Sequence, residues 1–591
     1  YIFCKMNSNY IYDELRLKHS VSSNRELSSA YGKYGIASVS KQATEFGLRV
    51  LSNGGNAFDA AFALAFALAF YHPQAGNIGG GGYLLYKRAD SPAPEIINYR
   101  EVAPGGVKIE NYIKKDGEVD QEATSFGPSS VCVPGTVKCF CLIQKEYGIL
   151  DQAYILKELA KEMENGAVIT RYQANCLNRL SKKLAICEES RKHYVKEGGI
   201  FREGDKLYNK ELVETYQRIA EHGCEDFYSG KIAEIIEEDI SSNGGFVTVD
   251  DLKKYELKVV EPIFAEFKDF RIWSVPPEGG GSILIDIINQ LNTPIFYSID
   301  VFGPEFYAGV AEASKVAFSR RLHYHGDVDI TGSEIYNLIF DRKEAEKKFI
   351  ENILTKIKAL KSNKLLKGND FSGSEREDIN NHSIGDTSGS FNGVPSDKGE
   401  TTHFTIIDKW GNVVSNSYTL NLRYGSKWSV RGTGFLMNGS MDAFTFIPGK
   451  PNYFNVIGSR YNLLAPNKRP ASNMSPVIIT GKDAEVVAAL GTPGGPAIQT
   501  KLATVILSYL LRNDALRSVS ESRAHHQGYP DILYWEEGFD KDKLRILEKM
   551  GYNLKKKNEP AGDVHGAFRS EKGYLFISDY RREGFANSVK L

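Results

Sequence analysis

Cysteine is absent from the whole C-terminal part of the chain. All seven cysteines stand at or before Cys224, and none follows in a sequence of 591 residues. A disulfide-stapled scaffold carries its cysteines more densely and spreads them more evenly. Cys139 and Cys141 are separated by one residue, which is not the two-residue spacing of a zinc knuckle or a thioredoxin-type pair. We therefore expect the cysteines to fill the core.

An excess of charge and a long apolar run are also lacking. The 73 Lys and Arg residues balance 74 Asp and Glu residues, for a formal net charge of -1. Proteins that coat nucleic acid or acidic membranes need a positive field, so this balance argues against both. The most apolar stretch, residues 60–70, is far shorter than the about 20 residues of a spanning helix and predicts a buried helix. The chain begins at Tyr1, and no basic segment followed by an apolar one is visible, which leaves the compartment open.

The common catalytic signatures are missing as well. The sequence contains no G-x-S-x-G, no H-E-x-x-H and no G-x-x-x-x-G-K-[ST], so these serine hydrolase, zinc protease and phosphate-loop motifs do not supply the chemistry. The glycine run 79–82 lacks the Lys and Ser/Thr of a phosphate cradle. We interpret that run as a tight turn where backbones pack closely, and we predict neither a metal nor an organic cofactor.

The composition that remains is that of a large globular protein. Hydrophobic residues make up 42% and charged residues 25% of the chain, which suffices for a sizeable core and excludes a disordered polymer. Residues 1–34 are polar and are expected to form a tail or a loose helix. Glycine, serine, aspartate and asparagine dominate residues 368–400, which predicts a flexible segment. The periodicity predicts helices over 40–51, 57–71, 152–190, 339–361, 498–512 and 541–551, and strands over 83–86, 477–480, 485–490 and 574–578.

A β-hairpin is predicted immediately after the flexible segment. Residues 401–407 and 413–420 alternate in polarity around the turn residues 408–412. A loop centred on Trp410 pairs Thr401 with Thr419. Because side chains alternate with period two, Thr401, Thr419 and Asn421 are expected on one face.

The start of this hairpin suggests a specific chemistry. A threonine hydroxyl is a poor nucleophile unless a base lies beside it. If the bond between Glu400 and Thr401 is cut, the new α-amine of Thr401 lies within reach of its own Oγ. An α-amine titrates near pH 8, so at neutral pH it can accept the hydroxyl proton. By pattern alone, however, a Thr-Thr pair that opens a strand is ordinary.

Short motifs from about residue 36 to 585 carry a resemblance to a known family. They occur in family order and include Asn53-Gly54-Gly55-Asn56-Ala57, Arg100-Glu101-Val102-Ala103-Pro104, Val133-Pro134-Gly135-Thr136, Thr401-Thr402-His403-Phe404, Tyr418-Thr419-Leu420-Asn421, Asn467-Lys468-Arg469-Pro470 and Gly491-Thr492-Pro493-Gly494-Gly495. Together they resemble the γ-glutamyltransferases, also called γ-glutamyltranspeptidases or glutathione hydrolases. The resemblance covers nearly the whole chain.

This resemblance implies an α/β (α+β) fold of the N-terminal nucleophile hydrolase type. That fold is a four-layer αββα sandwich formed by two subunits cut from one precursor. The implied division is an N-terminal tail over 1–34, a large subunit over 35–400 and a small catalytic subunit over 401–591. The two subunits would remain together as a heterodimer, and the family's extracytoplasmic location would apply.

The resemblance also implies residue roles. Thr401 would be both the self-cleavage residue and the acyl-accepting nucleophile, and the cut would fall between Glu400 and Thr401. Thr419 would hydrogen-bond Thr401, in agreement with the predicted register. Backbone N–H groups of Gly494 and Gly495 would bind the oxyanion, an interaction that can contribute several kcal/mol.

The remaining implied roles concern the substrate. Arg100 would hold the α-carboxylate of the γ-glutamyl group by bidentate hydrogen bonds. Asn421 and Ser472 would complete this pocket. Residues 446–461, with Tyr453 and Phe454, match the family's active-site lid in length and aromatic content.

Four positions depart from the family pattern: Ser440, Ala443, Asn473 and Ala497. The family usually has Gln or Glu where Ser440 stands and an acid, which grips the substrate's α-ammonium, where Ala443 stands. A hydrogen bond to a charged group is worth about 1.5–3 kcal/mol, so Ala443 should weaken recognition of the amino group. Ser440, Asp442 and Asn473 are the alternatives that would compensate. A serine pair and an Arg are usual where Asn473 and Ala497 stand.

The expected function is transfer of a γ-glutamyl group from glutathione or a related amide, through a Thr401 ester, to water, an amino acid or a peptide. One alternative is an acylase for another carboxylate-bearing acyl group, glutaryl-like or poly-γ-glutamyl, which Ala443 and Ser440 favour. The other is an unprocessed binding protein that kept the fold and lost the activity. No nucleic acid partner is expected.

Overall fold

Two large β-sheets dominate the protein, whose computed structural model describes residues 27–322, 324–327, 348–349, 352–353, 399–450, 452, 456–557 and 562–589. Both sheets have seven strands. The first sheet contains, in spatial order, β19 (Phe585–Ser588), β2 (Gly35–Ser38), β10 (Gly399–Ile407), β11 (Val413–Leu422), β3 (Gly81–Lys87), β4 (Glu95–Asn98) and β7 (Lys258–Val260). The second contains β1 (Ser28–Gly32), β18 (Gly573–Ser578), β17 (His565–Ser570), β13 (Val486–Gly491), β12 (Val477–Thr480), β9 (Phe270–Ser274) and β8 (Ile263–Phe267).

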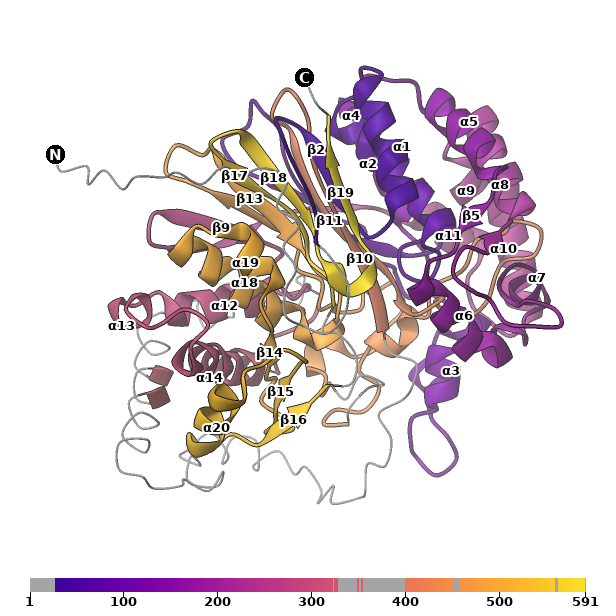
Figure 1. The fold of residues 1–591 in the computed structure, drawn as a ribbon. Helices are drawn as coiled ribbons and strands as arrows, with labels where there is room; N and C mark the ends of the chain where they lie inside the picture. Colours follow the sequence, from indigo (N-terminus) through magenta and orange to yellow (C-terminus); the bar gives the residue numbers. More distant parts are fainter. Residues whose placement is uncertain are drawn as a thin grey trace.

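Helices cover the outer face of each sheet (Figure 1). On the first sheet lie α1 (Lys41–Ser52) and α2 (Ala57–Tyr71), which contact its strands. Further helices from the N-terminal half belong to the same hydrophobic cluster, namely α4 (Thr136–Tyr147), α5 (Gln152–Met163), α6 (Arg171–Leu184), α7 (Glu188–Tyr194), α8 (Lys210–His222) and α10 (Lys231–Ser242). The second sheet is covered by α12 (Gly281–Leu291), α14 (Pro304–Arg321), α18 (Ile498–Arg512), α19 (Ala515–Ser520) and α20 (Lys541–Lys549). The result is the predicted four-layer αββα sandwich.

The core follows this layering. Alternate residues of β10 point to opposite faces: Phe404 and Ile406 pack with the α1–α2 side, whereas Ile407 packs with residues between the sheets. Helix α2 is buried along its whole length, which confirms that residues 60–70 form a core helix. Asn56 caps its N-terminus through a capping box with Asp59. Across the described residues, no helix is both long and apolar enough to cross a membrane.

The predicted elements near the site are present, with one correction at the N-terminus. The strands at 477–480 and 574–578 and the helix at 498–512 match β12, β18 and α18 within one residue. By contrast, residues 28–32 do not belong to a tail, because they form strand β1 and pair antiparallel with β18. The predicted helix at 339–361 and the flexible segment at 368–400 lie outside the described residues, apart from short pieces at 348–349, 352–353 and 399–400.

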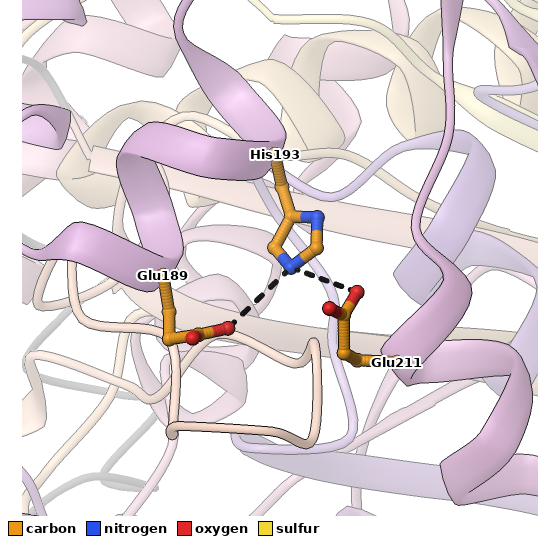
Figure 2. A group of neighbouring side chains, drawn as sticks. All are labelled: Glu189, His193 and Glu211. Carbon is orange, nitrogen blue, oxygen red and sulfur yellow. Dashed lines mark ion pairs between the residues drawn. The ribbon is translucent and has the colours of Figure 1, made fainter.

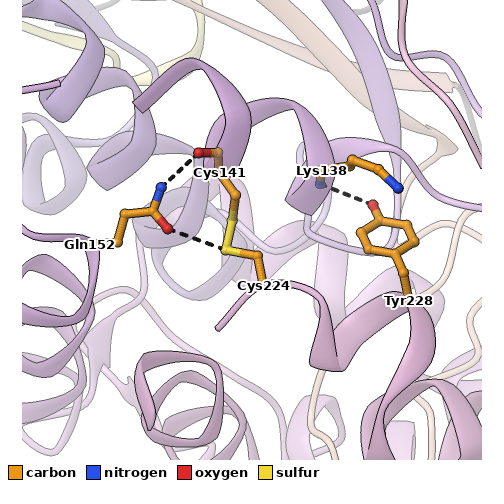
Figure 3. The surroundings of a disulfide bond; sticks show 5 residues. All are labelled: Lys138, Cys141, Gln152, Cys224 and Tyr228. Carbon is orange, nitrogen blue, oxygen red and sulfur yellow. Dashed lines mark hydrogen bonds between the residues drawn. A yellow bond between two sulfur atoms is a disulfide. The ribbon is translucent and has the colours of Figure 1, made fainter. Parts of the chain in front are cut away.

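Two cysteines depart from their predicted role as core fillers. Cys141 on α4 and Cys224 form a disulfide that joins positions 83 residues apart (Figure 3). Gln152 at the start of α5 lies against this disulfide and donates its amide to the Cys141 carbonyl at 2.6 Å. The free cysteines of the described region are buried as predicted; they are Cys132, Cys139, Cys176 and Cys187. Cys4 lies outside that region.

Candidate functional site

The β10–β11 hairpin fixes the positions of the two candidate catalytic threonines. Thr401 is paired with Thr419 and Ile407 with Val413, which confirms the predicted register. Thr401 shares its face of β10 with His403 and Ile407, the face toward the second sheet. Only 9% of Thr401 is exposed. A short irregularity in the ladder between Gly399 and Thr401 sets the residue apart from the segment before it.

Thr401, Thr419 and the peptide bond before Thr401 form a hydrogen-bonded unit. The hydroxyl of Thr401 donates to Thr419 Oγ1 at 3.4 Å, and Thr419 Oγ1 donates to the carbonyl oxygen of Glu400 at 2.6 Å. The backbone N–H of Asn421 donates to Thr419 Oγ1 at 2.8 Å. The Thr419 hydroxyl therefore has its single proton directed at the carbonyl that precedes Thr401.

Among the residues that the structure describes, no charged base is hydrogen-bonded to the Thr401 hydroxyl. Within the described residues, its side chain has no hydrogen bond to an acid, an imidazole or an amine. The nearest histidine in sequence, His403, bonds Ser417 and Thr405 instead, at 2.8 and 3.0 Å. Burial lowers the pKa of the His403 imidazole well below its usual range, so that ring is neutral at pH 7.

The side chain of Glu400 is a site feature that sequence reasoning missed. Its carboxylate is buried and receives hydrogen bonds from Arg423 Nε at 2.6 Å, from Tyr172 Oη at 2.8 Å and from Arg582. Tyr172 in turn accepts a hydrogen bond from Arg423 Nη2 at 3.0 Å. Side chains from three separate segments of the chain therefore fix the position of Glu400, the residue that precedes the candidate cleavage site.

Arg100 and Ser440 meet at a second carboxylate, that of Glu101. Ser440 Oγ donates to Glu101 Oε1 at 2.8 Å, and Arg100 Nη1 lies 2.6 Å from Glu101 Oε2. Arg100 is only 1% exposed, yet its Nε and Nη1 make no hydrogen bond of acceptable geometry with any described residue. Nη1 is thus already engaged in an ion pair with Glu101, whereas Nε is a buried donor without a partner among the described residues and can receive a carboxylate ligand.

Asn421 links the threonine pair to Ser440. The residue has φ 72°, a left-handed conformation that asparagine tolerates better than most residues. Its Nδ2 donates to the carbonyl of Gly439 at 2.8 Å, one residue before Ser440. Thr401, Thr419, Asn421, Ser440 and Arg100 are therefore joined through adjacent contacts, as their common assignment to one site requires.

Ser472 is linked to the Arg100 region through Glu278, whereas the carbonyl of the neighbouring Asn473 accepts a hydrogen bond from Gln499 at 2.7 Å. The backbone N–H of Ser472 donates to the Glu278 carbonyl at 2.9 Å, and Asn98 Nδ2 donates to Glu278 Oε1 at 3.4 Å. Asn98 Oδ1 accepts the N–H of Arg100 at 3.0 Å. Burial raises the pKa of Glu278 to about 7, and nearby Asp327 acts in the same direction. Glu278 is a titratable group that the sequence analysis did not single out.

The candidate oxyanion glycines have backbone conformations that favour glycine. Gly494 has φ 134° and Gly495 has φ 57° at the start of a 3-10 helix, η6 (Gly495–Ala497), which packs beside β10. A Cβ on Gly494 would lie 2.1 Å from Lys501 Nζ. Lys501 is buried and donates to the Pro493 carbonyl at 3.3 Å, and burial lowers the pKa of its amine well below the usual value.

The glycine run at 79–82 packs backbone against backbone, as predicted, but it is not the predicted tight turn, because Gly81 and Gly82 begin strand β3 and Gly79 forms a β-bridge with Met437. A Cβ on Gly80 would lie 2.2 Å from the Thr419 carbonyl oxygen, and one on Gly82 would lie 2.3 Å from the Ser417 carbonyl oxygen. The absence of side chains thus allows β3 and the residues before it to approach β11 directly.

Ala443 and a separate cavity lie apart from the hydrogen bonds described above. Ala443 is half-buried, and its carbonyl accepts a hydrogen bond from Asn462 at 2.8 Å. The lid residues Tyr453 and Phe454 lie outside the described residues. A cavity of about 370 Å³, lined in part by Asp300, Arg512 and Arg517, shares no residue with the Thr401 site.

The chain is similar in sequence to known proteins over most of its length. A family model described as Gamma-glutamyltranspeptidase matches residues 43–589. A glutathione hydrolase proenzyme of Escherichia coli (strain K12) is 32% identical over 545 residues, which cover 90% of this chain and 89% of that protein. One from Pseudomonas sp. (strain A14) is 32% identical over 520 residues, covering 86% and 84%.

The solved structures are consistent with the fold. A cephalosporin acylase from Bacillus halodurans matches with a TM-score of 0.78 and 22% identity, covering 98% of this chain and 100% of that one. The chain therefore shares the αββα sandwich fold of this acylase. The family model and the curated relatives place it among the N-terminal nucleophile hydrolase enzymes, and within them the chain belongs to the γ-glutamyltranspeptidase family.

Proposed function

We propose that the chain is a self-processing γ-glutamyltransferase and glutathione hydrolase whose nucleophile is Thr401. The observation that carries the proposal is the hydrogen-bonded sequence from Thr401 Oγ1 to Thr419 Oγ1 to the Glu400 carbonyl oxygen, at 3.4 and 2.6 Å. This arrangement supports attack of the Thr401 hydroxyl on the carbonyl before it, because the carbonyl is already polarised by a donor.

Cleavage follows as an N-to-O acyl shift and a hydrolysis. Thr401 Oγ bonds to the Glu400 carbonyl carbon while its proton passes to Thr419 Oγ1 and the Thr419 proton passes to the carbonyl oxygen. The C–N bond then breaks while the hydroxyl proton of the tetrahedral intermediate passes to the departing nitrogen, which leaves an ester on Thr401 and a free α-amine. Water hydrolyses the ester to the Glu400 carboxylic acid and regenerates the Thr401 hydroxyl, so one water is consumed for each peptide bond cut.

The liberated amine then serves the second reaction. With no charged base on Thr401 among the described residues, the α-amine is the group that accepts the hydroxyl proton when Thr401 attacks a γ-glutamyl amide. Gly494 and Gly495 are proposed to bind the oxyanion, and Thr419 remains hydrogen-bonded to the nucleophile. The amide C–N bond then breaks as the α-ammonium returns its proton to the departing amine, and water or an acceptor amine next attacks the ester, which releases the acyl group and regenerates the Thr401 hydroxyl.

Substrate recognition is assigned to the Arg100 region. Arg100 is proposed to bind the α-carboxylate through its unused Nε donor, and Asn421, Ser472 and Asn473 to line the same pocket. Ser440 is proposed to act through Glu101, whose Oε1 it bonds at 2.8 Å.

The experiment that tests the proposal is the Thr401→Ala substitution. We expect it to abolish both the split into two fragments on denaturing electrophoresis and the turnover of a γ-glutamyl anilide. Thr402→Val is the matched control, because the Thr402 hydroxyl is buried and has no hydrogen-bond partner among the described residues. Normal cleavage of the Thr401→Ala protein would contradict the role of Thr401. If the wild-type protein itself stays uncut and inactive, the chain is a binding protein that lost the activity.

A second substrate class is favoured by one observation, Ala443 in place of the acid that grips the α-ammonium. This residue favours an acylase for glutaryl-like or poly-γ-glutamyl groups, which retain the carboxylate for Arg100. Turnover of γ-glutamyl and glutaryl anilides separates the two candidates. Faster glutaryl hydrolysis would reject γ-glutamyl as the principal group, and Ala443→Asp should then shift the ratio by about tenfold or more toward γ-glutamyl.

A further inference from the structure

Three potential metal ligands converge on the outer helices, where no role has been assigned. Glu189 and His193 lie four residues apart on one face of α7, and Glu211 lies in the first turn of α8. Figure 2 shows the two carboxylates directed at the same imidazole nitrogen. One ligand atom from each residue lies within 4.8 Å of the other two.

The central histidine is oriented as a metal ligand would be. The His193 side chain is only 3% exposed, and its Nε2 has no hydrogen-bond partner among the described residues. Its other nitrogen is available for the hydrogen bond that the ring makes with the backbone of Tyr208. A backbone carbonyl at Nδ1 is the usual partner that fixes the tautomer of a ligating histidine and leaves Nε2 bare.

The distances suit a shared cation better than hydrogen bonds. Nε2 lies 3.8 Å from Glu189 Oε2 and 3.5 Å from Glu211 Oε2. An N–H···O hydrogen bond has its heavy atoms about 2.7–3.2 Å apart. Two tetrahedral ligands about 2.0–2.2 Å from one Zn²⁺ are separated by roughly 3.3–3.6 Å, which is close to the observed spacing.

The local charges also favour a cation. Lys192 pairs with Glu211 Oε1 and leaves Oε2 directed at the imidazole. Glu189 Oε2 is buried and makes no hydrogen bond within the described part of the chain. With the ring proton on Nδ1, three lone pairs face one another without a donor between them, an arrangement that costs free energy unless a positive charge occupies the centre.

We propose that Glu189, His193 and Glu211 bind one Zn²⁺ ion, with water as the fourth ligand. Imidazole together with carboxylates suits zinc, whereas Ca²⁺ and Mg²⁺ prefer oxygen ligands alone. The carboxylate side chains are 19% and 17% exposed, which leaves the ion a path from solvent. The site is independent of the function proposed for Thr401.

The ion would join two helices that hold the same loop. Ser190 on α7 donates to the Lys427 carbonyl at 2.8 Å, and Asn209, which caps α8, donates to the Gly434 carbonyl at 2.7 Å. The loop 427–434 follows β11, the strand that carries Thr419. Zinc at this position is therefore a structural ion that stabilises the attachment of this loop to α7 and α8.

The test uses the untagged full-length protein, stripped with a chelator and dialysed. We expect calorimetric titration with ZnCl₂ to give one site per chain, and the melting temperature to rise with zinc. Glu189→Gln and His193→Gln should each weaken binding by more than about 100-fold, because they remove a ligand rather than its supporting contact. Glu188→Gln and His222→Gln are the matched controls, since both residues are exposed on the same two helices.

Two results would overturn the proposal. One is the absence of zinc binding by the stripped wild type, and the other is equal binding by the ligand variants and the controls. X-ray absorption of the zinc-loaded wild type provides a measurement that does not depend on folding of the variants. We expect a shell of nitrogen and oxygen with one imidazole, and a shell that contains sulfur would contradict the site.

Discussion

Thr419 Oγ1 donates a hydrogen bond of 2.6 Å to the carbonyl oxygen of Glu400. The donor and the acceptor are 19 positions apart and are brought together by the hairpin register. One side chain thus contacts both the candidate nucleophile and the carbonyl that the nucleophile would attack. If this bond polarises the carbonyl, its removal should slow cleavage more than it perturbs the fold.

The first prediction concerns Thr419. Thr419→Val removes the donor to the carbonyl at nearly constant volume, so cleavage at 400–401 should slow by about 10²–10³, the range for a single oxyanion donor. Thr419→Ser should keep most of the rate. Time-resolved denaturing electrophoresis of freshly refolded protein gives the rates, with Thr402→Val as control. Equal rates for Thr419→Val and wild type would exclude the polarising role.

The second prediction concerns the carboxylate of Glu400. Replacing Glu400 by Ala removes the buried carboxylate that Arg423 and Arg582 share, which should cost about 3–5 kcal/mol of unfolding free energy. Urea denaturation in a Thr401→Ala background measures this loss on an uncut chain. The exposed Glu548→Gln change is the control for loss of one negative charge. A loss below about 1 kcal/mol would mean that the cluster is not needed for stability.

The third prediction concerns pH. Because burial raises the pKa of Glu278 to about 7 from an ordinary value near 4.5, the folded state binds this proton more tightly than the unfolded state. The associated stability is fully present below about pH 4.5 and is lost as the pH rises to about 7. Its size is roughly 3 kcal/mol.

Glu278→Gln removes this titration. The free energy of unfolding of Glu278→Gln relative to the parent should therefore increase between pH 4.5 and 7.5 and stay level above. Urea titrations at several pH values, again on the Thr401→Ala background, measure the difference. Parallel pH curves for the two proteins would show that Glu278 has an ordinary pKa.

The fourth prediction concerns the disulfide. Loss of the Cys141–Cys224 bond, which closes a long loop, should lower the unfolding free energy by about 2–4 kcal/mol. The paired change of both cysteines to Ala and treatment of wild type with a reducing agent should lower the melting temperature similarly. Cys139→Ala removes a buried free thiol and is the control. A reducing agent that further destabilises the paired variant would point to another cause.

The parts of the fold that were predictable have local causes. The hairpin register depends only on the alternation of β10 and β11 and on the length of the turn between them. Helix α2 begins after the capping residue Asn56 and ends before Pro73, and both signals are visible in the sequence. The order of the family motifs adds information about the whole sandwich that no local pattern contains.

The parts that were not predictable depend on partners distant in sequence. Arg582 contacts Glu400 across 182 positions, and Ser440 contacts Glu101 across 339. Cys141 and Cys224 carry no spacing that distinguishes a pair from two buried thiols. Strand β1 lies in a polar segment whose sequence gives no strand signal. It forms because its backbone pairs with β18, which is distant in the sequence.

The strand order has a consequence for the two pieces that a break at 400–401 would create. In the first sheet, β2 inserts between β19 and β10, while β11 is followed by β3 from before the break. In the second, β1 and β9 flank the four strands that come from after it. Strands of one piece thus pair with strands of the other in both sheets. Separation of the two pieces would break the backbone hydrogen bonds between these strands in both sheets. We therefore expect the two pieces to reach this arrangement when the chain folds before it is cut.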